Sequence, residues 1–93
     1  MDSRAAVWDA WNRRHIELDH AERRIRCVEV EQAMSDPDRR EVIDERDGVL
    51  YHAVLGLTGV GRLLLVVWVD HADGRYPVHA HQAGRREARK YYE

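Results

Sequence analysis

Cysteine, phenylalanine and proline are nearly missing from this sequence, which has one cysteine, no phenylalanine and two prolines among 93 residues. The single Cys27 excludes an internal disulfide framework and a zinc site made of several cysteines. The longest apolar run, Leu63 to Val69, is far shorter than the roughly 20 residues that cross a bilayer. The first residues show no apolar leader, so we expect a cytoplasmic protein with no membrane contact.

The chain also lacks an excess of charge of one sign. Its 15 basic and 17 acidic residues give a formal net charge of −2 at pH 7, so no general attraction for nucleic acid is expected. Residues 28–48 are acidic, whereas residues 49–93 are slightly basic. Any contact with RNA or DNA must therefore come from local clusters, of which Arg23-Arg24-Arg26 and Arg85-Arg86-Arg89-Lys90 are the candidates.

Helical spacing is present in the first part of the chain. Over residues 5–22, intervals of three and four bring Trp8, Trp11, His15 and Leu18 onto one face, which predicts a helix. We expect the two tryptophans to lie in the core or in an interface, because a small domain without phenylalanine needs other large apolar side chains. Within the first ten residues, a short edge strand is the alternative to a helix.

A second helix and a series of strands follow. The helix is predicted from about Arg26 to Met34 and is ended by the Asp36-Pro37 step. The apolar period then changes from 3.6 to 2, and Pro77 confines the last strand to an edge or a strand start. Strands are predicted over 41–46, 49–57, 62–70 and 75–81, with turns at 47–48, 58–61 and 72–74 and a short basic helix at 85–92.

This order predicts one α+β domain over residues 1–93. It has two N-terminal helices, an antiparallel three- to four-stranded meander sheet and a C-terminal helix. Residues 62–70 are apolar on both faces and are expected to form the central strand.

Two stretches of the sequence resemble the BrnT family of toxins. They are GRLLLVVWV at 61–69 and VHAHQAGRRE at 78–87, which follow the family's Gly-Arg-x-Leu-x-Val-Val and Ile-Ser-Ala-Arg-x-Ala-x-x-x-Glu patterns. The VLG of residues 54–56 and the EVEQA of residues 29–33, followed by Asp36-Pro37, are also similar to family segments. The resemblance covers most of residues 25–90.

The resemblance implies a RelE-like fold and a ribonuclease toxin of a type II toxin–antitoxin pair. Its substrate would be RNA, its partner a cognate antitoxin of the ribbon-helix-helix type, and cleavage would proceed through attack of the 2′-hydroxyl without metal or other cofactor. The sequence departs from the family where His79 and His81 replace its serine and arginine, and where Tyr51 and His52 replace its Arg-Tyr.

Histidine and glutamate supply the candidate acid–base residues. His79 and His81 share one strand face, Glu87 is the glutamate that the resemblance retains, and His52 is a reserve candidate. The candidate phosphate-binding residues are Arg62, Arg85, Arg86 and Arg89.

Three alternatives stay open at this point. His79 and His81 are also compatible with a metal pair that recruits a third ligand, or with two solvated side chains on an edge strand. The whole chain is compatible with a non-catalytic RelE-like binding or assembly module that has lost the nuclease arginines. An exposed strand edge would favour a homodimer or an antitoxin contact.

Overall fold

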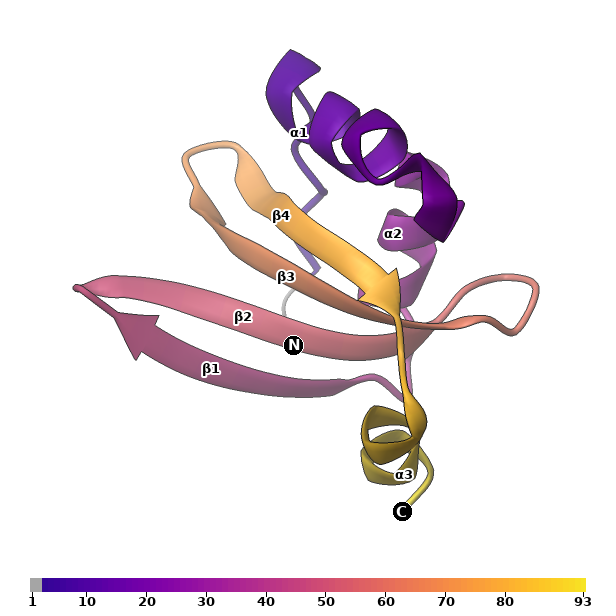
Figure 1. Ribbon diagram of the computed structural model, residues 1–93. Helices are drawn as coiled ribbons and strands as arrows, with labels where there is room; N and C mark the ends of the chain where they lie inside the picture. The colour runs from indigo at the N-terminus through magenta and orange to yellow at the C-terminus, as the bar shows by residue number, and fades with distance from the viewer. Residues whose placement is uncertain (1–2) are drawn as a thin grey trace.

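Four strands follow one another along the chain and pair in the same order in space (Figure 1). The computed structural model describes residues 3–93. Strands β1 (Arg40–Arg46), β2 (Val49–Leu57), β3 (Leu63–His71) and β4 (Gly74–Gln82) form one antiparallel sheet of order β1-β2-β3-β4. The predicted meander is confirmed with four strands. β4 lies at an edge, as Pro77 requires, and its register with β3 shifts at Val67/Trp68.

Helical segments precede and follow the sheet. They are α1 (Ala10–Arg14), the π-helical η1 (His15–Asp19), the 3₁₀ turn η2 (Ala21–Arg23), α2 (Cys27–Met34) and α3 (Arg85–Tyr92). The predicted second and last helices are confirmed, and the α+β class with them. None of the helices among residues 3–93 has the length and apolarity needed to span a membrane.

The N-terminal region differs from the predicted helix over residues 5–22. Residues 5–7 are extended, since Ala6 forms a parallel bridge with Arg75, and the helix begins only at Ala10. Asp9 caps that helix by accepting a hydrogen bond from the backbone N–H of Asn12. The short edge strand considered for the first ten residues is therefore closer to the observed structure, in the form of a single bridge.

The predicted apolar face of this region also points the other way. Trp11 and Leu18 are 59% and 68% exposed, whereas Asn12 and Ile16 are buried. The Asn12 side-chain amide donates hydrogen bonds to the carbonyl oxygens of Val7 and Pro77, at 2.9 and 3.0 Å. These bonds fix the rotation of the helix and turn the tryptophan outward, which an apolar pattern does not reveal.

One face of the sheet carries the main core. α2 packs against β2 and β3, and Figure 1 shows α1 and α2 on the opposite side of the sheet from α3. Gly56 allows the close approach of α2, because a Cβ there would lie 2.0 Å from the carbonyl oxygen of Ala33. The buried apolar cluster consists of Ile16, Ile25, Val30, Ala33, Met34, Val54, Leu64, Val66, Trp68 and Ala80.

The other face of the sheet is covered only at one end, by α3. Tyr91 packs against Leu55 and Leu63, and its hydroxyl donates a hydrogen bond to the Asp36 carboxylate. Burial alone would raise the pKa of Asp36, but hydrogen bonds from Tyr91 and from the backbone N–H groups of Leu57 and Asp38 outweigh it and lower the pKa. This ionised carboxylate anchors α3 to the sheet.

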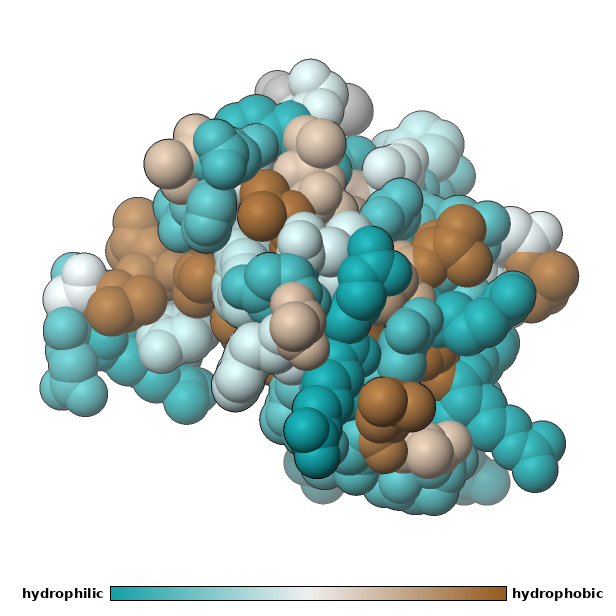
Figure 2. Space-filling view, turned by 90° about the horizontal axis from the view of Figure 1, so that it is seen from above, coloured by the Kyte–Doolittle hydropathy of each residue, from teal (hydrophilic) through white to brown (hydrophobic). Residues whose placement is uncertain are grey.

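The rest of that face, and the tip of the β1–β2 hairpin, stay open. Val42, Ile43, Val49 and Leu50 are all between 44% and 66% exposed. In Figure 2, seen from the side of α1 and α2, apolar surface is visible at the left end of the molecule, toward which the tip of the β1–β2 hairpin projects in Figure 1. The structure thus has one filled face and one largely free face.

Candidate functional site

Two histidines project from β4 onto the free face of the sheet. His81 pairs with Leu65 and His79 with Val67, and these partners point away from the core residues Leu64 and Val66. Nε2 of His79 lies 2.8 Å from Nδ1 of His81. The predicted common face is confirmed, and the two rings are close enough to share a proton.

Glu87 joins the two histidines from the first turn of α3. Each of its carboxylate oxygens lies 3.3 Å from Nε2 of His81. Oε1 also accepts a hydrogen bond of 2.9 Å from the backbone N–H of Gly84, which caps the helix. The cap fixes the carboxylate beside His81, so the three side chains form a continuous row, His79–His81–Glu87.

The partners in this row determine where its protons lie. An ionised carboxylate only accepts hydrogen bonds, so Nε2 of His81 carries a proton and donates it to Glu87. In the neutral ring, Nδ1 of His81 then accepts from Nε2–H of His79. His81 therefore holds the Glu87 carboxylate through its Nε2 proton, and His79 holds His81 in this tautomer.

His79, at the end of the row far from Glu87, is held neutral. Burial lowers the pKa of His79 below its usual value of 6.5, and the neighbouring His81, Arg23, His15 and His20 lower it further. His15 and His20 were not among the site residues predicted from the sequence, and Arg23 was predicted only as part of a local arginine cluster. Their separation from β4 along the chain gives no local signal of this proximity.

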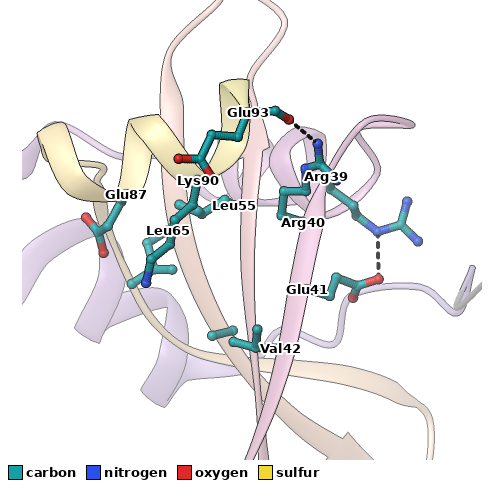
Figure 3. Close-up of a pocket in the computed structure, with 10 residues that line it drawn as sticks. Arg39, Arg40, Glu41, Val42, Leu55, Leu65, Glu87, Lys90 and Glu93 are labelled. Carbon is teal, nitrogen blue, oxygen red and sulfur yellow. Dashed lines mark hydrogen bonds and ion pairs between the residues drawn. The ribbon is translucent and has the colours of Figure 1, made fainter.

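A groove of about 590 Å³ opens beside Glu87 on the free face (Figure 3). Glu87 and Lys90 line it from α3, Arg40 lines it from β1, and Leu55 and Leu65 form part of its floor. The remaining lining residues are Arg39, Glu41, Val42, Ala53 and Glu93. The groove combines an apolar floor with walls that carry three basic residues, Arg39, Arg40 and Lys90, and three carboxylates, Glu41, Glu87 and Glu93. The floor suits flat rings, and the basic side chains suit the phosphates of a ligand.

Further cations lie along α3. Arg85, Arg86 and Arg89 are exposed, and within residues 3–93 their side chains make no hydrogen bond or ion pair. On the opposite wall, Nη2 of Arg40 donates to the carbonyl oxygen of Glu93 at 2.7 Å, which links β1 to the end of α3. Three guanidinium groups on the helix that lines one wall of the groove are thus available to a ligand.

Arg62 is placed differently from the arginines of α3. Its guanidinium donates to the carbonyl oxygens of Arg24 and Arg23, at 2.7 and 2.8 Å, and lies 3.3 Å from the Glu29 carboxylate. Nε also contacts the Gln82 side chain at 3.4 Å. Arg62 therefore holds the left-handed turn at Arg24 against the start of β3, and its donors are occupied within the fold.

His52 lies on the opposite face of the sheet from the histidine row. It pairs with Trp68 across β2 and β3, and the two rings stack with centroids 3.7 Å apart and an interplanar angle of 3°. Nε2 of His52 lies 3.2 Å from Asp70, which also accepts a 2.7 Å hydrogen bond from Arg4. These bonds from Arg4 and His52 lower the pKa of Asp70. The structure does not bring His52 together with His79, His81 and Glu87.

The two N-terminal tryptophans have different surroundings. Trp8 packs against the main core, and its Nε1–H donates to Glu31 at 2.6 Å. Trp11 is exposed and stacks on His15 with ring centroids 5.2 Å apart. One is therefore a core residue, as expected, and the other offers an open ring face.

Metal binding and thiol chemistry find little support in the geometry. Among residues 3–93, no group of three or more histidine, cysteine, aspartate or glutamate side chains is arranged to hold a metal ion. Cys27 is buried, and burial together with the nearby Glu17 raises the pKa of its thiol to about 12. A thiol of such high pKa is a poor nucleophile at neutral pH.

No protein-family model matches the chain, and no curated protein matches it.

Proposed function

We propose that this protein is a ribonuclease toxin of the BrnT type, which cleaves RNA in the bacterial cytoplasm and is held inactive by a cognate antitoxin. The observation that carries the proposal is the hydrogen-bonded row His79–His81–Glu87, whose Glu87 lines a groove that also holds cations. Cleavage of RNA needs a group that moves a proton and a charge that stabilises the phosphate, and both are found here side by side.

The reaction would begin at the carboxylate that lines the groove. Glu87 takes the proton of a 2′-hydroxyl, and the 2′-oxygen attacks the adjacent phosphorus. The Nε2 proton of His81 passes to the departing 5′-oxygen, and the proton held by Glu87 then crosses the 3.3 Å contact to restore it on Nε2. The products are a 2′,3′-cyclic phosphate and a free 5′-hydroxyl, and no metal ion takes part.

The negative charge of the phosphate would be met by cations on both sides of the groove. Lys90 and Arg40 line it, and Arg85, Arg86 and Arg89 extend the positive surface along α3. Arginine binds phosphate through two parallel hydrogen bonds, whereas lysine acts as a point charge. Arg62 has its donors occupied within the fold, so phosphate binding is assigned to α3 and β1.

The alternative is a binding module with the same fold and no catalysis. One observation favours it, because Glu87 already caps its own helix and is not free to move toward a substrate. In that case the row would only stiffen the junction between β4 and α3.

Controlled expression in a bacterial host distinguishes the two functions. We expect the wild-type protein to arrest growth and to create new 5′ ends in total RNA. His81→Ala and Glu87→Ala should each relieve the arrest at equal protein level. His71→Ala is the matched control, since His71 is an exposed histidine at the β3–β4 turn, and it should remain toxic. Normal growth with abundant folded wild-type protein would contradict the nuclease proposal.

A further inference from the structure

The two edge strands of the sheet differ in how far other segments cover them. The outer edge of β4 is covered at one end by residues 5–7, since Val7 N–H donates to Arg75 at 2.7 Å and Arg75 N–H donates to Ala5 at 2.9 Å. Further along, Arg23 donates to the carbonyl oxygen of Ala80. β1 pairs with β2 alone among the described residues, so its outer edge is open to another strand.

The open strand is exposed over its whole length. All seven residues of β1 are exposed, and its two apolar side chains, Val42 at 66% and Ile43 at 62%, lie on opposite faces. Near the hairpin turn, β1 is therefore exposed on both faces of the sheet. An added strand would therefore find backbone groups and apolar surface on both faces.

The hairpin turn determines which backbone groups of β1 point outward. Asp47 and Gly48 both have positive φ, at 51° and 80°, and form the two-residue turn that joins β1 to β2. In such a hairpin the flanking pair, Arg46 and Val49, exchanges hydrogen bonds, and every second pair does the same. The N–H and C=O groups of Glu41, Ile43 and Glu45 therefore face away from β2.

We propose that β1 pairs in antiparallel orientation with β1 of a second copy of this chain, about a twofold axis at Val42. In this register Val42 faces Val42 of the second copy, and Arg40 faces Asp44 on both sides of it. The outward groups of Glu41 and Ile43 then exchange hydrogen bonds across the interface. This inference goes beyond the proposed ribonuclease activity and does not depend on it.

Charge selects this register over its neighbours. Sliding one β1 strand along the other keeps the outward backbone groups paired only when the shift is an even number of residues. Each of these neighbouring registers places like charges directly opposite each other, which is destabilising. In the register centred on Glu41, Glu41 faces Glu41. In the register centred on Ile43, Glu41 faces Glu45 and Arg40 faces Arg46. In the register centred on Asp44, Asp44 faces Asp44. The sequence of β1 thus complements itself in one alignment.

The dimer would join the two candidate sites. Arg40 and Val42 line the groove, so pairing about Val42 continues the free face from one copy to the other as an eight-stranded sheet. Asp44 of the second copy would enter beside Arg40 at the groove wall. Because the overlap is only five residues per strand, less than a stable interface needs, we expect an association that depends on concentration.

A disulfide at the axis tests both the dimer and its register. Val42 lies in a non-hydrogen-bonded pair, where Cα atoms are about 4.5 Å apart and a disulfide fits. In a Cys27→Ser background, Val42→Cys should give a covalent dimer under mild oxidation. Ile43→Cys is the matched control, because it is equally exposed but faces Glu41 in this register, so it should give little dimer.

Charge variants supply the second arm of the test. Asp44→Arg should strongly reduce the yield of the Val42→Cys dimer, and the swapped variant that adds Arg40→Asp should restore it. Circular dichroism confirms that each variant is folded. The proposal would be overturned if the protein is monomeric at all concentrations and Val42→Cys yields no more covalent dimer than Ile43→Cys. A higher dimer yield from Ile43→Cys would also overturn it. Equal dimer yields from the two cysteine variants, or a Val42→Cys yield that Asp44→Arg does not change, would contradict the proposal as well.

Discussion

His79 is a histidine whose surroundings oppose its charged form. Burial comes first among the causes of its lowered pKa, followed by His81, Arg23, His15 and His20. An unfolded chain has no such surroundings, so it binds a proton at His79 at a higher pH than the folded protein does. Folding and protonation of this side chain are therefore coupled.

The coupling has a definite sign. As the pH falls below about 6.5, His79 becomes protonated in the unfolded state but stays neutral in the folded state. The free energy of unfolding therefore decreases. His79→Gln should remove this part of the pH dependence. Urea unfolding at pH 7.5 and pH 5.5 measures it, and the decrease should be smaller in the variant. An equal decrease in both proteins would show that His79 is not the group responsible.

Gly56 is the residue at which the sheet and α2 come closest. A Cβ at this position would meet the carbonyl oxygen of Ala33 at 2.0 Å, a contact that only a shift of the helix relieves. We expect Gly56→Ala to lower the free energy of unfolding by about 3 kcal/mol or to prevent folding.

Gly59→Ala is the control for that substitution. A Cβ there would meet only the flexible side chain of Gln32, at 3.3 Å, so the loss should be well under half as large. Chemical denaturation of the two variants compares them directly. Similar losses would mean that backbone freedom, rather than the helix contact, explains the need for glycine at position 56.

The limits of sequence prediction are visible at single residues. Alternation along β2 separates Tyr51 from His52, but whether His52 shares a face with His79 depends on the register across three strands. His81 and Glu87 are only six residues apart, and a strand followed by a capped helix is enough to bring them together. The local part of the site was therefore predictable, whereas the contribution of His15 and His20 required the tertiary structure.

At the scale of elements, the strands and α3 follow their sequence patterns closely, whereas the N-terminal helix does not. β2 and α3 have the predicted bounds, because alternation and the glycine turns mark their ends. The first helix is oriented by the buried amide of Asn12 and changes into a π-helical turn. Polar contacts of this kind override an apolar pattern, and the pattern alone predicted the wrong face.

The position of α3 depends on one buried hydrogen bond. Tyr91 and Asp36 are 8% and 9% exposed, and Tyr91 donates to the charged carboxylate. Tyr91→Phe should cost about 2 kcal/mol, the range for a bond to an ionised group, and should increase hydrogen exchange in residues 85–92. Tyr92→Phe, at a side chain that is 68% exposed, should change neither. Unchanged exchange in Tyr91→Phe would mean that apolar packing and the Arg40–Glu93 hydrogen bond suffice to hold α3.

At the scale of the whole molecule, one face of the sheet is filled and the other carries the histidine row, the groove and the cations. The net charge of −2 gives no general attraction for RNA, so the proposed RNA binding relies on the local cations of this face. A single-stranded RNA that contacts Arg85, Arg86 or Arg89 would release counterions there.

The salt dependence of RNA binding measures these contacts. Each of Arg85→Gln, Arg86→Gln and Arg89→Gln that removes a phosphate contact should reduce the slope of log K against log salt by about 0.7. Arg14→Gln, at an exposed arginine of the N-terminal helix, should leave the slope unchanged. A slope that is insensitive to all three α3 variants would place RNA elsewhere on the molecule.

The most direct measurement is RNA cleavage by the purified protein in the presence of EDTA, with and without ribosomes. Wild-type protein is expected to produce fragments that end in a 2′,3′-cyclic phosphate and to leave a substrate with a 2′-deoxy group at the cleaved position intact. Glu87→Gln and His81→Asn should each slow cleavage by about 10²- to 10⁴-fold. Folded wild-type protein that cleaves no RNA under either condition, or cleavage that both variants retain in full, would contradict the assignment of His81 and Glu87 as the proton-transfer pair of a ribonuclease.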